Sequence, residues 1–116
     1  NFIYVANNEG LLEYNGSYWL LHPSPNNTIV RSVCAVGNKI YSGSYMEFGF
    51  WEPGLDGIQK YNSLTTTINI NLIEDEQFWS ITPYNKWILF QSLSRIYIYN
   101  KEDSTVKVID TDNTIQ

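Results

Sequence analysis

Few side chains of this 116-residue chain have a type and spacing that could carry out chemistry. The acidic cluster Glu74-Asp75-Glu76 stands out, but acid–base catalysis needs two carboxylates that face each other across a cleft. Three consecutive acids on a connection more often form a solvated loop. His22 is the single histidine and lies beside Pro23, so we interpret it as a hydrogen-bonded or exposed imidazole and not as a general base. We therefore predict no catalytic residues.

The sequence also offers little for a metal or a cofactor. One histidine excludes a histidine-based metal site within the chain, and one cysteine, Cys34, excludes an intrachain disulfide. Between Val33 and Ala35, Cys34 is best explained as a buried, unreactive thiol. There is no Gly-rich phosphate-binding loop, and the serines lack the context of a nucleophile elbow. We predict no metal site and no cofactor.

Arg31, Tyr45, Glu47 and Trp79 are the candidates for binding a polar ligand. The planar fork of Arg31 suits a carboxylate or sulfate group, and the flat face of Trp79 suits a sugar ring. Each also has a structural alternative, which is packing between sheets for Trp79 and an ion pair or backbone contact for Arg31. Which explanation holds depends on the elements that position these side chains.

Composition indicates a packed domain and excludes some partners. The chain is 43% hydrophobic and 16% aromatic, which is enough to build a core. Its net charge of −5 argues against nucleic-acid binding, because little is available to neutralise phosphates. No run approaches the roughly 18 apolar residues of a membrane helix, so we predict no membrane contact by this segment. Since the chain opens within a strand-like pattern at Phe2, we expect it to be a segment of a longer protein.

The chain has the pattern of an all-β fold. Short β-branched and aromatic runs alternate with Gly, Asn, Pro and Asp, and tight turns are explicit at Asn15-Gly16, Gly37-Asn38 and Asn85-Lys86. The expected strands cover residues 2–6, 11–14, 18–21, 29–36, 39–42, 48–51, 78–82, 87–90, 95–99 and 106–109.

An internal repeat indicates how these strands are grouped. The segment around Ser32 matches that around Ser80 at an offset of 48 residues (80 − 32), and Tyr4 matches Tyr41 at an offset of 37 (41 − 4). Four-stranded units of roughly 40 to 50 residues are typical of β-propeller blades. We therefore predict a partial propeller of two to three blades, at about residues 1–28, 29–76 and 77–116. A β-sandwich is the alternative.

The blade pattern places the binding candidates on one face. Residues 29–36 and 77–83 would be innermost strands, with the connections 23–28 and 64–76 passing from blade to blade. The loops 7–10, 45–47 and 92–94 share the face around the mouth of the axis with those connections. Arg31 and Trp79 would both enter innermost strands there.

Three segments resemble a known family. These are Asn8 to Gly16 followed by Trp19, Pro25 to Ser32 followed by Tyr41-Ser42-Gly43, and Glu47-Phe48-Gly49-Phe50-Trp51. Together they resemble the propeller repeats of bacterial two-component-type transcription regulators. Met46 replaces the asparagine usual before the Glu-Phe-Gly segment, which puts a ligand role of that position in doubt.

The resemblance implies a non-catalytic, ligand-sensing region in the periplasmic part of a membrane-anchored regulator. Its implied partners are a carbohydrate or other polar small molecule, the remaining blades of the same chain, and a second copy in a homodimer. Two alternatives stay open: a fragment of a propeller-fold polysaccharide-active enzyme (a glycosidase or lyase), or a protein–protein interaction platform.

Overall fold

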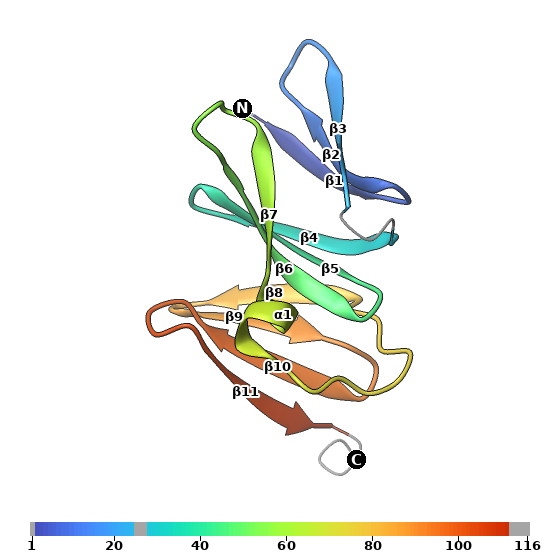
Figure 1. The fold of residues 1–116 in the computed structure, drawn as a ribbon, viewed down its shortest axis with the longest axis vertical. Helices are drawn as coiled ribbons and strands as arrows, with labels where there is room; N and C mark the ends of the chain where they lie inside the picture. Colours follow the sequence, from blue (N-terminus) through green and yellow to red (C-terminus); the bar gives the residue numbers. More distant parts are fainter. Residues whose placement is uncertain (1, 25–27, 112–116) are drawn as a thin grey trace.

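The computed structural model describes residues 2–24 and 28–111. They form three antiparallel sheets that follow one another along the longest axis of the molecule (Figure 1). The N-terminal sheet consists of β1 (Ile3–Asn7), β2 (Gly10–Tyr14) and β3 (Trp19–Pro23). The central sheet consists of β4 (Val30–Val36), β5 (Lys39–Ser44), β6 (Glu47–Pro53) and β7 (Gln59–Ser63). The C-terminal sheet consists of β8 (Ser80–Tyr84), β9 (Trp87–Gln91), β10 (Arg95–Asn100) and β11 (Thr105–Asp110).

The all-β prediction is confirmed, and each predicted strand run overlaps a strand. Two elements were not located from the sequence. Strand β7 lacks an apolar alternation, and it forms by pairing with β6 at the edge of the central sheet. The helix α1 (Leu64–Ile68) follows it, within the segment for which we predicted only a connection. The Ser63 side chain caps this helix by accepting a hydrogen bond from the Thr66 amide, and Asn69 ends it in a left-handed conformation.

Strand pairing in the central and C-terminal sheets follows the predicted offset of 48 residues. Ser32 pairs with Gly43 in the central sheet, and Ser80 pairs with Gln91 in the C-terminal sheet. The next strand continues this equivalence, since the pair Ile40 and Trp51 corresponds to the pair Ile88 and Tyr99. The first three strands of the two sheets therefore form the same unit in the same register.

The N-terminal sheet follows the second offset. Tyr4 pairs with Glu13 just as Tyr41 pairs with Phe50, which is an offset of 37 for both partners. Strand β1 is thus the equivalent of β5, the second strand of the unit. Among the described residues, no strand of this sheet takes the place of β4. Residues 25–27 of the predicted motif Pro25 to Ser32 lie outside the described residues.

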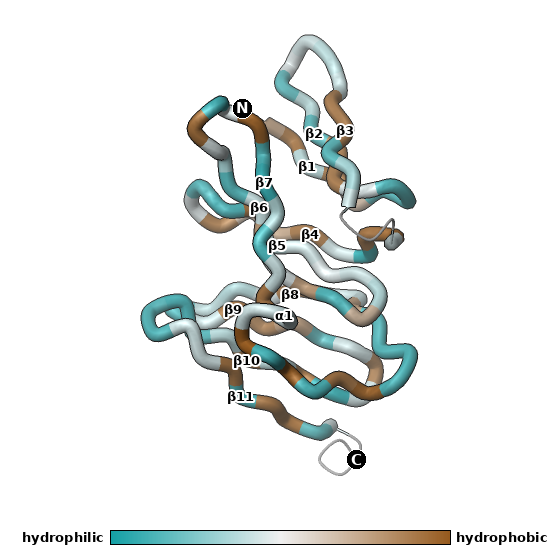
Figure 2. The backbone as a smooth tube through the Cα atoms, viewed as in Figure 1, coloured by the Kyte–Doolittle hydropathy of each residue, from teal (hydrophilic) through white to brown (hydrophobic). Residues whose placement is uncertain are grey.

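The central sheet is covered on both sides. Between the central and C-terminal sheets, the C-terminal junction buries eight side chains: Tyr41, Phe48, Leu64, Phe78, Ile88, Phe90, Tyr97 and Tyr99. Between the N-terminal and central sheets, the N-terminal junction buries three: Leu11, Ile40 and Trp51. Hydrophobic stretches recur in all three sheets, including strands at the two ends of the stack (Figure 2).

Candidate functional site

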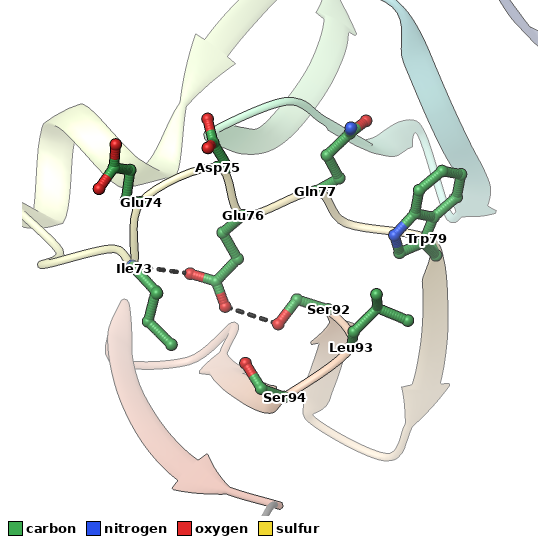
Figure 3. Close-up of a pocket in the computed structure, with 9 residues that line it drawn as sticks. All are labelled: Ile73, Glu74, Asp75, Glu76, Gln77, Trp79, Ser92, Leu93 and Ser94. Atoms are coloured by element: carbon green, nitrogen blue, oxygen red, sulfur yellow. Dashed lines mark hydrogen bonds between the residues drawn. The ribbon is translucent and has the colours of Figure 1, made fainter.

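A pocket of about 270 Å³ lies where the connection between β7 and β8 meets the loop between β9 and β10 (Figure 3). Residues 73–77 and Trp79 form one side, and residues 92–94 form the other. Backbone hydrogen bonds hold the connection against the loop between β5 and β6, from the Met46 amide to the Glu76 carbonyl (2.7 Å) and from the Phe78 amide to the Ser44 carbonyl (3.2 Å). The structure therefore gathers segments on which sequence analysis placed the binding candidates.

Trp79 and Arg31 meet at the edge of this pocket. The Trp79 side chain is 47% exposed, and the Arg31 guanidinium carbon lies 4.9 Å from the centre of its ring. Arg31 Nε also donates a hydrogen bond to Gln77 Oε1 at 2.7 Å. A stacked cation holds the indole in place but occupies one of its faces. The Nε edge of the arginine fork is thus engaged within the protein, while much of the tryptophan stays accessible.

Tyr45 lies beside the same residues. It forms an isolated antiparallel bridge with Gln77, and its hydroxyl donates a hydrogen bond to Asp75 Oδ1 at 2.5 Å. This bond to Asp75 raises the pKa of the Tyr45 hydroxyl, because ionisation would place two negative charges together. Tyr45 is 40% exposed, so it could still accept a hydrogen bond from a ligand.

Glu47 does not line this pocket. Its carboxylate is buried and accepts hydrogen bonds from the Tyr61 hydroxyl at 2.5 Å and from Thr65 Oγ1 at 2.7 Å. Burial and the nearby Glu47 together raise the pKa of Tyr61. The arrangement ties β6 to β7 and α1, so the structure gives Glu47 an internal role and leaves its predicted ligand role without support.

Glu76 is the important residue that sequence analysis missed. We expected residues 74–76 to form a solvated loop; Glu74 and Asp75 are exposed, but Glu76 is buried. Its carboxylate accepts hydrogen bonds from Ser92 Oγ (2.6 Å), the Tyr97 hydroxyl (2.7 Å) and the Ile73 amide (3.1 Å), and Figure 3 shows two of them. The solvated-loop prediction is therefore wrong for Glu76, because these three donors replace the water that a buried carboxylate loses.

The hydrogen bonds of Glu76 link the pocket to the C-terminal junction. Burial, reinforced by the bond to Glu76, raises the pKa of Tyr97 to about 12. Arg95 Nη1 donates to the Tyr97 hydroxyl at 3.3 Å and opposes this shift. The base of the pocket is thus fixed, and ligand contacts must come from its rim.

Met46 occupies the position where the resemblance suggested an asparagine. Its φ angle is 55°, in the left-handed region that asparagine tolerates better than most residues. Its amide donates to the carbonyl of Glu76, and its sulfur lies 3.2 Å from the Glu76 amide nitrogen. The position therefore fixes the loop to the connection through its backbone, and its side chain lies against Glu76.

The structure also shows the surroundings of His22 and Cys34. His22 is buried, with Nε2 2.6 Å from Glu13 Oε1, so the hydrogen-bonded interpretation is confirmed. Cys34 is half-buried, and burial raises the pKa of its thiol. Within residues 2–24 and 28–111, no group of three or more His, Cys, Asp or Glu side chains could hold a metal ion.

Comparisons of the chain with protein-family models, with curated proteins and with solved structures found no match. No helix in the described part of the chain has the length and apolar character needed to cross a membrane.

Proposed function

We propose that this chain is a segment of a β-propeller sensor that binds a polar small molecule, a carbohydrate, at the pocket beside Trp79. The propeller assignment is supported by the shared pairing registers of the three sheets, which follow the two offsets found in the sequence. Consecutive antiparallel sheets of one repeating unit that pack face to face are typical of blades. The four-stranded central and C-terminal sheets then represent complete blades.

The observation that carries the ligand assignment is the exposed indole of Trp79 at the edge of a pocket whose lining combines apolar side chains with acidic, amide and hydroxyl groups. A flat aromatic surface packs well against the C–H face of a sugar ring, while nearby polar groups bind its hydroxyls. Glu74 and Asp75 also line the pocket, with exposed carboxylates that point away from Ser92 and Ser94 (Figure 3). Arg31 stacks on Trp79 and donates to Gln77 through Nε. Two carboxylates repel an anion, so a neutral sugar fits this rim better than a uronic acid or a sulfated sugar.

The sensor role and a periplasmic position in a membrane-anchored regulator rest on the sequence resemblance. Asn8 to Gly16 covers the turn after β1, the strand β2 and the start of the turn that leads to β3, and Glu47 to Trp51 lies in β6. Both segments contribute to the packing of the sheets, since Leu11 and Trp51 lie in the N-terminal junction and Phe48 lies in the C-terminal junction. The resembling segments thus shape the scaffold, and the ligand is selected by loops.

A titration monitored by tryptophan fluorescence and by calorimetry tests the proposal. The probes are a panel of neutral oligosaccharides, with oligogalacturonate as the anionic counterpart. We expect at least one neutral oligosaccharide to bind, and Trp79→Ala to weaken this binding about tenfold or more, since stacking of this kind contributes on the order of 1.4 kcal/mol.

Trp19→Ala is the matched control, because Trp19 is 52% exposed and lies on β3, outside the pocket. It should leave the affinity unchanged. The proposal fails if no neutral member of the panel binds, or if Trp79→Ala binds as tightly as the unaltered chain.

A further inference from the structure

The sheets at the two ends of the stack each leave one face uncovered. We call the face of a sheet that points toward the next sheet in the chain its forward face, and the opposite one its backward face. Inside the molecule, the forward face of the central sheet packs on the backward face of the C-terminal sheet. In this contact, the ring of Phe48 stacks on that of Phe90 at 4.2 Å. The backward face of the N-terminal sheet and the forward face of the C-terminal sheet have no such partner among the described residues.

The uncovered backward face of the N-terminal sheet is equivalent in sequence to the buried backward face of the C-terminal sheet. Combining the two offsets gives 85 residues (37 + 48), which relates β1 and β2 to β9 and β10. Four backward-face residues of the N-terminal sheet therefore correspond to four that fill the C-terminal junction. The pairs are Ile3 with Ile88, Val5 with Phe90, Leu12 with Tyr97, and Tyr14 with Tyr99. All four residues on the uncovered face have apolar or aromatic side chains.

The uncovered forward face of the C-terminal sheet is equivalent in sequence to the forward face of the central sheet, which forms the other side of the C-terminal junction. At the offset of 48, Leu89 corresponds to Tyr41, Ile96 to Phe48, and Ile98 to Phe50. A groove of about 430 Å³ runs along this face, and Leu89, Ile98 and Trp87 are among its lining residues. Each of the two uncovered faces is therefore one half of an interface that the molecule already contains once in complete form.

Exposure agrees with this interpretation, and the backward face also lacks charge. On the backward face, Ile3 is 54% exposed, Val5 39% and Trp19 52%, and these side chains carry no charge. On the forward face, Tyr84 is 63% exposed, and Lys107, which pairs with Ile98, is the one charged residue among those that line the groove. Contiguous apolar surface of this kind marks an interaction site.

We propose that a second copy of this chain covers the uncovered forward face with its own uncovered backward face. The contact is heterologous, because the two surfaces are different parts of the molecule. It repeats the relation between the central and C-terminal sheets, so copies associate head to tail. This inference rests on the observed repeat of the sheets and is independent of any ligand at Trp79. The blades that lie next to this chain in the proposed propeller are then those of another copy.

Complementary blocking variants test the head-to-tail arrangement. Val5→Lys places a charge on the backward face only, and Ile98→Lys places one on the forward face only; an unpaired charge buried in an apolar contact strongly opposes association. Leu55→Lys, in the exposed turn between β6 and β7, is the matched control. Sedimentation velocity measures each protein over a range of concentrations, and circular dichroism and thermal melting verify that each is folded.

We expect the unaltered chain and Leu55→Lys to form dimers and larger species as concentration rises. Val5→Lys and Ile98→Lys should each be monomeric alone, and their equimolar mixture should form a dimer and nothing larger, because only one intact pair of faces remains. Ile3→Lys and Leu89→Lys replace either variant that does not fold. The inference is overturned if the unaltered chain stays monomeric up to millimolar concentration, if either variant alone still dimerises, or if their mixture stays monomeric.

Discussion

The two junctions of this molecule come from one repeating unit but are built differently. The C-terminal junction is aromatic: the rings of Phe48 and Phe90 stack at 4.2 Å, and Phe78 meets Phe48 edge-on at 4.8 Å. The N-terminal junction has a smaller apolar centre, with Leu11 against Ile40 and Trp51. At the equivalent positions, Leu11 corresponds to the larger Phe48, whereas Ile40 corresponds to Ile88.

The N-terminal junction also contains charge. Glu13 occupies the forward-face position that Phe50 occupies in the central sheet, and it lies 2.6 Å from the buried His22. A buried polar pair of this kind contributes little net stability, because the loss of hydration offsets the hydrogen bond between the two groups. Apolar area is the main source of stability at such contacts. Two junctions with the same pairing register can therefore differ in how much they stabilise the fold. We expect the N-terminal sheet to separate from the central sheet first when the protein unfolds.

Phe48→Ala should produce the largest effect. Phe48 is fully buried and contacts Phe78, Phe90 and Tyr97, so its truncation leaves a cavity that the rigid sheets cannot close. We expect the free energy of unfolding to fall by about 3–5 kcal/mol. Urea denaturation monitored by circular dichroism measures it. Phe2→Ala is the control, since Phe2 is 57% exposed, and it should change stability by less than about 0.5 kcal/mol. Similar losses for both variants would contradict the burial of this junction.

Leu11→Ala should have a smaller and local effect. Leu11 is fully buried in the N-terminal junction, and we expect a loss of about 2–4 kcal/mol in the free energy that holds the N-terminal sheet in place. Because the C-terminal junction does not include Leu11, the other two sheets should stay folded. Hydrogen exchange followed by mass spectrometry should show faster exchange in β1 to β3 and unchanged exchange in β5 and β9. Uniformly faster exchange would mean that the two junctions act as one cooperative unit.

The same comparison shows how far the sequence determines the fold. Strands with β-branched and aromatic residues, such as β4 and β10, could be predicted because their pattern is local. The repeat could be predicted because the β4–β5 and β8–β9 hairpins have the same length. Ser32 and Ser80 therefore pair at the same register, each with the residue eleven positions further along the chain. Strand β7 could not be located, since its residues Gln59 to Ser63 become a strand only through pairing with β6.

The site was predictable only in part. Trp79 and Arg31 could be placed together because they hold equivalent repeat positions, but the contact of Arg31 with Gln77 depends on the path of a long connection. Glu76 was missed because its burial results from donors that lie up to 21 residues away in the sequence, in Ser92 and Tyr97. Glu47 was expected at the mouth, yet the unpredicted strand β7 and helix α1 bring Tyr61 and Thr65 to its carboxylate. Long-range hydrogen bonds of this kind leave no local pattern.

The smallest effect concerns the tyrosine hydroxyls that anchor each junction to a buried carboxylate, Tyr97 to Glu76 and Tyr61 to Glu47. The pKa of Tyr97 is raised to about 12, whereas tyrosine in an unfolded chain ionises near pH 10. Below about pH 10 both states keep the proton, so stability does not depend on this group. Between about pH 10 and 12 the unfolded state releases the proton that the folded state retains, and the free energy of unfolding should fall by up to about 1.4 kcal/mol per pH unit for each such tyrosine.

Urea denaturation at pH 8, 9, 10 and 11 measures the slope of this free energy against pH. Tyr97→Phe and Tyr61→Phe should each reduce it, and Tyr18→Phe, which removes an exposed hydroxyl, is the control. If Tyr97→Phe keeps the slope of the unaltered chain, the Tyr97 hydroxyl is not buried against Glu76 in solution, and the base of the pocket is less rigid than its hydrogen bonds indicate.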